Sequence, residues 1–179
     1  MILIGLGANL PHPELGPPRH TLAAALARLR ERGVRVVACS RWYATRPYPA
    51  ALADQPWFVN GVARIETALD PAALLALMHE VEWALGRVRQ RKWEPRIVDL
   101  DLIAYHDRVL AGDGGGPVVP HPRLAERGFV LIPLRDVAPG WRHPVTGLGL
   151  DRMIAGLGPE QAVSLHRTPE PAPSRASGG

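Results

Sequence analysis

Two aspartates, Asp99 and Asp101, lie two positions apart in the β-rich stretch 96–103. Because successive side chains of a strand point to opposite faces, both carboxylates should share one face, with Leu100 and Leu102 on the other. Neighbouring carboxylates repel each other unless a cation lies between them or one of them takes up a proton. Carboxylate oxygens are hard ligands and no Cys or His is interleaved with them, so the pattern favours Mg²⁺ over zinc.

The alternation alone is equally typical of an ordinary solvated strand face. Basic residues on both sides of the strand favour a chemical role, and they are Arg87, Arg89, Arg91, Lys92, Arg96, His121 and Arg127. Arginines around metal-binding acids suit a polyphosphate ligand. Two Mg²⁺ ions about 3.5 to 4 Å apart would suit phosphoryl chemistry.

The composition is that of one globular domain. The chain has 179 residues, 46% of them hydrophobic, and we expect a single domain over residues 1–167 with a disordered Pro-, Ser- and Gly-rich tail over residues 168–179.

The net charge of +4 favours an anionic partner. The single Cys39 excludes an internal disulfide and is expected to be buried. With no signal peptide or apolar run of membrane-spanning length, a cytoplasmic protein without a membrane partner is predicted.

The order of hydrophobic patterns predicts a βαββαβ arrangement. Strands are expected over residues 2–8, 34–45, 57–67 and 96–103, and helices between residue 22 and Gly33 and between Asp70 and Gly86. Residues 105–110 are expected to form a short hairpin partner, and residues 129–137 and 148–157 further helices. This order predicts an α+β, ferredoxin-like fold, with an antiparallel-rich sheet, helices on one face and mobile active-site loops on the other.

Common nucleotide-binding loops are absent from the sequence. Nothing matches a Gly-rich turn that ends in Gly-Lys-Ser/Thr, and no protein-kinase motif set is present. The segment Gly5-Leu6-Gly7 follows a strand but lacks the third glycine of the dinucleotide fingerprint, so we interpret it as a tight turn.

A series of short motifs carries a more specific signal. In chain order they are Leu6-Gly7-Ala8-Asn9-Leu10, Ser40-x-Trp42-Tyr43-x-Thr45-x-Pro47, Asp54-Gln55-Pro56-x-Phe58-x-Asn60, Glu82-x-x-x-Gly86-Arg87-x-Arg89, Trp93-x-Pro95-Arg96-x-x-Asp99-Leu100-Asp101, Val119-Pro120-His121-Pro122 and Arg127-Gly128-Phe129-Val130-Leu131-x-Pro133-Leu134. In this order and spacing the chain resembles the 6-hydroxymethyl-7,8-dihydropterin pyrophosphokinase family of folate biosynthesis. The resemblance extends from residue 5 to about residue 139.

The resemblance implies transfer of pyrophosphate from ATP to the hydroxymethyl group of the dihydropterin, with release of AMP. It implies that Asp99 and Asp101 hold two Mg²⁺ ions and that these aspartates act in catalysis with Arg87 and Arg96. The residues that it implies for ATP binding are Glu82, Arg87, Arg89, Trp93, Arg96, His121 and Arg127. Those that it implies for pterin binding are Thr45, Arg46, Tyr48, Phe58, Asn60, Asp99 and Phe129.

Two other functions fit parts of the sequence. A ferredoxin-like sheet with exposed aromatic residues and a basic surface is also typical of RNA-recognition domains, although paired acids would repel phosphates unless metals intervene. A scaffold that has kept the fold without the chemistry is the other alternative. We expect a monomer that binds ATP and hydroxymethyl-dihydropterin and has no nucleic-acid partner.

Overall fold

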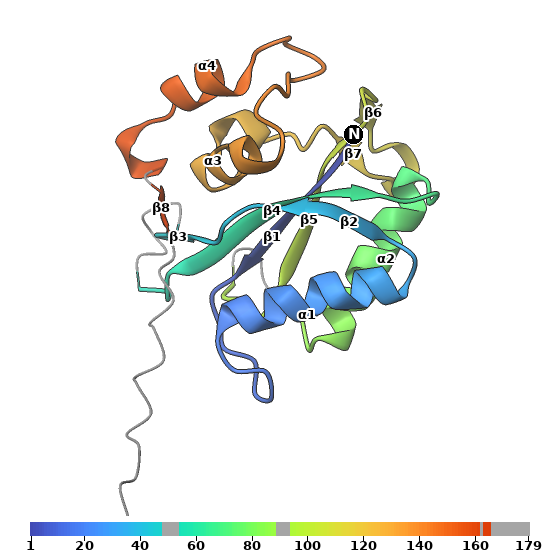
Figure 1. Ribbon diagram of the computed structural model, residues 1–179, viewed down its shortest axis with the longest axis vertical. Helices are drawn as coiled ribbons and strands as arrows, with labels where there is room; N and C mark the ends of the chain where they lie inside the picture. Colours follow the sequence, from blue (N-terminus) through green and yellow to red (C-terminus); the bar gives the residue numbers. More distant parts are fainter. Residues whose placement is uncertain (48–53, 89–93, 162, 166–179) are drawn as a thin grey trace, which may run out of the picture.

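The computed structural model describes residues 1–47, 54–88, 94–161 and 163–165 (Figure 1). In these residues the largest sheet has the strand order β5-β1-β4-β3-β8, and β2 also pairs with β4. All of its pairings are antiparallel. The strands are β1 (Ile2–Ala8), β2 (Arg35–Cys39), β3 (Tyr43–Thr45), β4 (Phe58–Glu66), β5 (Asp99–Tyr105) and β8 (Val163–Leu165).

Four α-helices and several short elements complete the described fold. The helices are α1 (Pro18–Glu31), α2 (Pro71–Ala84), α3 (Gly128–Val137) and α4 (Leu150–Ala155). Strands β6 (Leu110–Ala111) and β7 (Val118–Val119) form a separate small sheet. The single 3₁₀ turns are η2 (Asp113–Gly115), η3 (Leu124–Glu126) and η4 (Pro159–Gln161). Within the described residues, every helix is too short or too polar to span a bilayer.

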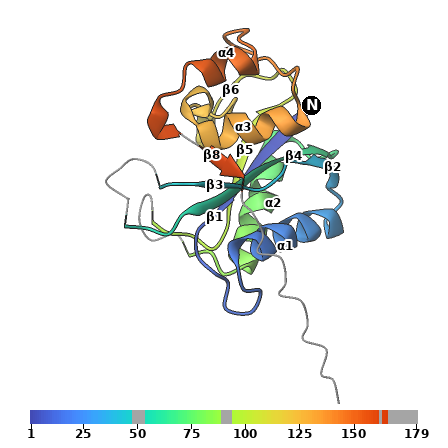
Figure 2. The ribbon, with the colours of Figure 1, turned by 60° about the vertical axis from the view of Figure 1, so that its left-hand side comes forward.

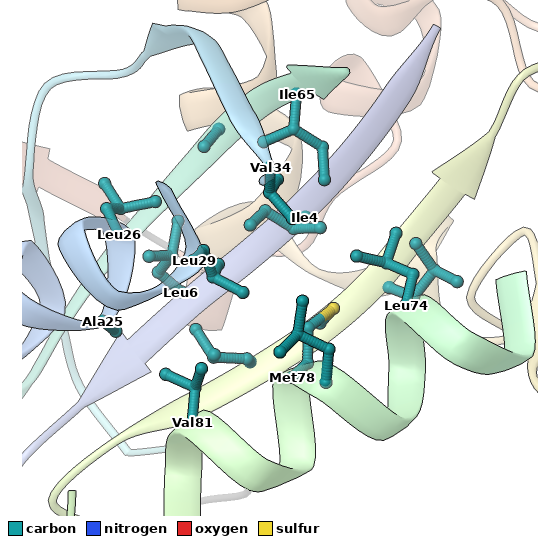
Figure 3. Close-up of a cluster of buried hydrophobic side chains, with 14 of the residues drawn as sticks. Ile4, Leu6, Ala25, Leu26, Leu29, Val34, Ile65, Leu74, Met78 and Val81 are labelled. Atoms are coloured by element: carbon teal, nitrogen blue, oxygen red, sulfur yellow. The ribbon is translucent and has the colours of Figure 1, made fainter. Parts of the chain in front are cut away.

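Helices α1 and α2 cover one face of the main sheet. Ile4 and Leu6 of β1 point between them and pack with Leu29 of α1 and with Met78 and Val81 of α2 (Figure 3). All of these side chains are at most 3% exposed. Apolar burial of this kind is the main stabilising contribution in a domain of this size, and it fixes α2 beneath β5.

The expectation that the other face carries only loops is wrong. Leu3 of β1, Val62 of β4 and Ile103 of β5 point away from α1 and α2, and they pack with Leu131 and Leu134 of α3. The sheet therefore lies between two helical layers, with α4 beyond α3 (Figure 2). The ferredoxin-like arrangement itself is confirmed, and α3 is an addition that covers part of the face expected to be open.

The signals at both ends of α2 are confirmed. The Asp70 carboxylate accepts the backbone N–H of Ala73 at 2.8 Å, and Pro71 occupies the first turn, where no amide donor is needed. Gly86 follows the helix with a φ of +80°, a conformation that favours glycine. These signals set the length of α2 and so the position of Glu82 in its last turn.

Three local predictions are wrong. Residues 34–45 form two strands, because Ser40 interrupts the pairing and its hydroxyl accepts the backbone N–H of Val62 at 3.0 Å. Residues 105–110 do not pair with β5, and Leu110 instead begins β6, which pairs with β7. Cys39 lies at the end of β2 and is exposed.

Some predictions fall outside the described residues. These are the roles of Tyr48, Arg89 and Trp93 and the disordered tail over residues 168–179. The single domain over residues 1–167 stays a prediction.

Candidate active site

One pocket opens where β1, β3, β4 and β5 come together at one end of the sheet. Its walls come from the strands, from the residues beside β3 and β5, and from the segment that leads into α3. The lining residues are Gly7, Thr45, Arg46, Phe58, Asn60, Arg96, Asp99, Asp101, Arg123, Glu126, Arg127 and Phe129. Nine of these twelve were predicted from the sequence: Thr45, Arg46, Phe58, Asn60, Arg96, Asp99, Asp101, Arg127 and Phe129.

The register of the strands places three of these residues in one row. Gly7 of β1 pairs with Asn60 of β4 on one side and with Asp99 of β5 on the other. A Cβ atom on Gly7 would lie 2.9 Å from Asn60 Oδ1, so a larger residue would displace the Asn60 side chain. Glycine at position 7 therefore lets the amide and the carboxylate face the same space.

Thr45 and Asn60 form a buried polar pair in the pocket wall. Asn60 Nδ2 donates to Thr45 Oγ1 at 2.7 Å. Asn60 is 6% exposed and Thr45 is 5% exposed. The pair leaves Asn60 Oδ1 and the Thr45 hydroxyl proton for a ligand with donors and acceptors on its edge. The structure thus brings together the two side chains predicted to hydrogen-bond the pterin.

Two aromatic rings line the same pocket from different elements. Phe58 begins β4 and Phe129 lies in the first turn of α3, and both are half-buried. The guanidinium of Arg96 lies 5.8 Å from the centre of the Phe58 ring, and that of Arg127 lies 5.4 Å from the centre of the Phe129 ring. Each ring therefore lies next to a guanidinium. The pocket thus places flat aromatic surfaces beside groups that can bind phosphate.

Asp99 is the centre of an ionic network. Its two carboxylate oxygens accept hydrogen bonds from Arg87 and from Arg96. Burial would raise the pKa of Asp99, but Arg96 and Arg87 outweigh that effect and hold the pKa below its ordinary value. Asp99 is therefore a carboxylate at neutral pH.

Glu82 anchors this network to α2. Its side chain is 2% exposed, and it accepts the backbone N–H of Leu100 at 2.7 Å and a hydrogen bond from Arg87. Arg87 thus bridges the acid on the helix and Asp99 on the strand. Neither Glu82 nor Arg87 is among the residues that line the pocket, and in this structure Asp99 joins them to it.

Asp101 has a different environment on the same strand face. Arg127 Nη1 lies 3.3 Å from its Oδ2 atom, and the Asp101 side chain is 38% exposed. Burial and the nearby charge of Asp99 raise the pKa of Asp101 to about 6. A divalent cation between the two carboxylates would offset this repulsion.

The carboxylates fit Mg²⁺ bound together with phosphate oxygens. In the described part of the chain, no group of three or more His, Cys, Asp or Glu side chains is placed to hold a metal ion. Mg²⁺ is commonly bound by one or two carboxylates plus substrate phosphates, whereas structural zinc takes four protein ligands. The donor set of Asp99 and Asp101 therefore matches the predicted metal.

His121 and Arg127 present two donors to one point. Burial, and then the charges of Arg127 and Arg123, lower the pKa of His121 to about 4, so its ring is neutral at pH 7. Nδ1 accepts the backbone N–H of Arg123 at 3.2 Å, which leaves the ring proton on Nε2. His121 Nε2 lies 3.3 Å from Arg127 Nη1. An anionic oxygen that lies to one side of this pair could accept a hydrogen bond from each of the two nitrogens.

Comparison with known proteins decides between the alternatives. Residues 3–139 match the model of the 7,8-dihydro-6-hydroxymethylpterin-pyrophosphokinase family. The chain belongs to this family. It is 37% identical over 153 residues to the 2-amino-4-hydroxy-6-hydroxymethyldihydropteridine pyrophosphokinase of Synechocystis, with 85% of this chain and 73% of the relative covered. The similarly named Pseudomonas aeruginosa protein is 41% identical over 157 residues, with 86% and 90% covered.

Solved structures agree on the fold. A Plasmodium falciparum HPPK-DHPS structure with pteroate is 12% identical and has a TM-score of 0.66, and the match covers 86% of this chain and 43% of that chain. The match therefore spans less than half of the Plasmodium chain and supports the ferredoxin-like fold alone. Together with the family match, the comparisons confirm the predicted class of enzyme, a pyrophosphokinase that acts on hydroxymethyl-dihydropterin in folate synthesis.

Sequence reasoning missed three residues of this pyrophosphokinase pocket, namely Gly7, Arg123 and Glu126. Gly7 belongs to the motif Leu6-Gly7-Ala8-Asn9-Leu10, and its pairing with Asn60 and Asp99 is visible only from the strand register. Arg123 precedes the η3 turn and Glu126 ends it, and the turn lies between His121 and Phe129, two residues already assigned to the site. Their place between two site residues was the one signal that could have indicated them.

Proposed function

We propose that the chain transfers the pyrophosphoryl group of ATP to the hydroxymethyl group of 6-hydroxymethyl-7,8-dihydropterin, which gives AMP and the pterin diphosphate. The hydroxyl oxygen bonds to the β-phosphorus, the bond from that phosphorus to the α,β-bridging oxygen breaks, and the hydroxyl proton is released. The observation that supports this most directly is the row of Asn60, Gly7 and Asp99, which puts a pterin-type polar pair beside a phosphate-type ionic network.

The pterin end of the proposed site is the polar pair with the two rings. Asn60 and Thr45 would bond the edge of the heterocycle, and Phe58 and Phe129 would contact its faces. Arg46 also lines this end, and its guanidinium lies 5.4 Å from the ring centre of Trp57. The proposed contacts of Arg46 and Tyr48 with the pterin use backbone groups.

The phosphate end of the proposed site consists of arginines around the two aspartates. Asp99 and Asp101 would hold two Mg²⁺ ions, which when bound neutralise the phosphate oxygens and lower the pKa of the attacking hydroxyl. Arg87 and Arg96 would exchange part of their bonding to Asp99 for the triphosphate. Arg127 and His121 would bind a phosphate oxygen at the point where their N–H groups converge.

Positioning and charge neutralisation supply the catalysis in this proposal, because phosphoryl transfer needs an in-line hydroxyl and compensation of developing charge. We assign no general base. Glu82 would contribute to nucleotide binding by holding Arg87, and roles for Arg89 and Trp93 stay predictions. The monomeric state, the cytoplasmic location and the absence of a nucleic-acid partner also stay predictions.

The test is a product assay with the purified chain, ATP, Mg²⁺ and hydroxymethyl-dihydropterin. We expect equal amounts of AMP and pterin diphosphate, and no product when Mg²⁺ is chelated or the pterin is left out. Release of ADP in place of AMP would contradict the proposed transfer. Binding of labelled RNA at physiological salt, with no turnover of ATP, would favour the RNA-binding alternative.

A further inference from the structure

Two charged side chains of opposite sign reach the pocket from one turn. Arg123 caps the N-terminus of η3 and Glu126 ends it, and both line the pocket. Within the residues that the structure describes, neither side chain forms an ion pair, although they are only three positions apart. Three other arginines that the structure describes near the aspartates are paired, Arg87 and Arg96 with Asp99 and Arg127 with Asp101.

The unpaired Arg123 adds charge to a part of the pocket that is already cationic. Its positive charge acts on both His121 and Arg127, and it helps to lower the pKa of each after burial. Arg127 has a single carboxylate partner at 3.3 Å, and that partner is Asp101. Cations gathered in this way repel each other, and an anionic ligand would offset the repulsion.

The position of Arg123 indicates which anion this would be. Arg123 follows His121 by two residues, precedes Arg127 by four, and lines the pocket together with Asp101 and Phe129. It therefore lines one pocket with Asp101, which we assign to the phosphate end, and with Phe129, which we assign to the pterin end. A guanidinium presents paired N–H donors that match two oxygens of one phosphate group.

We propose that Arg123 binds the pyrophosphoryl group during transfer and continues to hold it in the pterin diphosphate product. This inference rests on the proposed function and adds a residue that the family resemblance did not assign. Glu126 has the opposite effect in this proposal. Glu126 lines the same pocket and is exposed, so its negative charge weakens the hold on the diphosphate and favours product release.

The test compares two ligands that differ only in the diphosphate. Binding of hydroxymethyl-dihydropterin and of its diphosphate to the full chain is measured by calorimetry in the presence of Mg²⁺. Arg123→Gln should weaken binding of the diphosphate roughly 10-fold or more, the usual effect of one charge-assisted hydrogen bond pair, and change binding of the alcohol less than about twofold. Glu126→Gln should strengthen binding of the diphosphate about two- to fivefold.

Arg152→Gln is the matched control. Arg152 is an exposed arginine of α4 that does not line the pocket, and its substitution should leave the binding of both ligands unchanged. Arg123→Lys keeps the charge without the paired donors and should show an intermediate loss. It also serves as a second variant if Arg123→Gln lowers the melting temperature.

Two results would overturn the inference. If Arg123→Gln weakens binding of the alcohol and of the diphosphate equally, Arg123 contacts the pterin. If it changes the binding of neither ligand, Arg123 is a solvated charge at the rim of the pocket. Failure of the proposed function can be distinguished from failure of this inference. In the former case the unsubstituted chain would form no AMP and no pterin diphosphate in the product assay.

Discussion

Asn9 Oδ1 accepts the backbone N–H of Arg96 at 2.7 Å, while Asn9 Nδ2 donates to the carbonyl oxygen of Pro56 at 3.1 Å. Asn9 is 2% exposed and directly follows β1. One side chain thus ties the segment before β4, which leads into Phe58, to the segment before β5, which carries Arg96. The aromatic and ionic walls of the pocket share this support.

Asn9→Ala should lower kcat by at least about 10-fold, because both segments lose their common partner and the site depends on their spacing. Loss of these buried hydrogen bonds should also cost about 1 to 3 kcal/mol of unfolding free energy. Asn9→Asp keeps the acceptor for Arg96 but sets a buried carboxylate oxygen against the Pro56 carbonyl oxygen, so it should lose at least as much stability as Asn9→Ala. Steady-state kinetics and urea unfolding of the three proteins test this, and a wild-type kcat for Asn9→Ala would contradict it.

Substitution of the two aspartates should separate activity from stability. Asp99→Asn and Asp101→Asn should each reduce turnover by roughly 1,000-fold or more, as expected when a group that compensates transition-state charge is lost. Asp99→Asn should also lower the melting temperature, because Arg87 and Arg96 both bond to this carboxylate.

Asp101→Asn should leave the melting temperature unchanged or raise it. The Asp101 carboxylate lies near Asp99, has one arginine partner at 3.3 Å and has a raised pKa, so its removal relieves repulsion. The two carboxylates repel each other equally, but Asp99 has two arginine partners and Asp101 has one, so we expect this relief for Asp101 alone. Calorimetric unfolding of the two variants tests the difference, and equal losses of melting temperature would refute it.

The placement of both β5 aspartates on one face could be predicted because it depends on strand alternation alone. Asp99 and Asp101 point to one face, and each is paired with a glycine of β1, Gly7 for Asp99 and Gly5 for Asp101. The motif that contains Gly7 and the aspartate motif were both visible in the sequence. Local patterns of this kind survive folding because they depend on the backbone geometry of one element.

Features that depend on tertiary contacts could not be predicted. The second face of the sheet is covered by α3. The sequence around Leu3 and Ile103 does not indicate that α3 packs against them. The break between β2 and β3 depends on the hydroxyl of Ser40 meeting the backbone of Val62, which is 22 residues away. Arg123 reaches the pocket from a turn, where charged residues show no periodicity.

The aromatic wall gives a prediction that is specific for the pterin. Phe58→Ala should raise the KM for hydroxymethyl-dihydropterin about 10-fold, since stacking of a base on an aromatic ring is worth about 1 to 3 kcal/mol. Phe58→Tyr keeps the ring and should stay within about threefold of the unsubstituted chain. The KM for ATP serves as the internal control, and a larger change in that constant than in the pterin constant would show that Phe58 does not contact the pterin.

The link between β3 and α3 gives a pH dependence of stability. Tyr43 Oη donates to Asp136 Oδ2 at 2.9 Å, and Arg41 Nη2 donates to Asp136 Oδ1 at 2.8 Å. Burial would raise the pKa of Asp136, but the hydrogen bonds from Arg41 and Tyr43 outweigh it and hold the pKa below its ordinary value. A carboxyl whose pKa is depressed by folding stabilises the fold above its unfolded pKa, and this stabilisation is lost as the pH falls through the folded value.

Asp136→Asn should therefore lower the unfolding free energy by about 1 to 2 kcal/mol at pH 7, and the difference from the unsubstituted chain should shrink below about pH 4. Urea unfolding between pH 2 and pH 7 measures both. Asp151 is the matched control, because its carboxylate is 89% exposed and lies 3.8 Å from Arg135, so Asp151→Asn should change stability little at any pH. A difference for Asp136→Asn that persists undiminished at pH 2 would mean that the carboxylate charge does not hold β3 to α3.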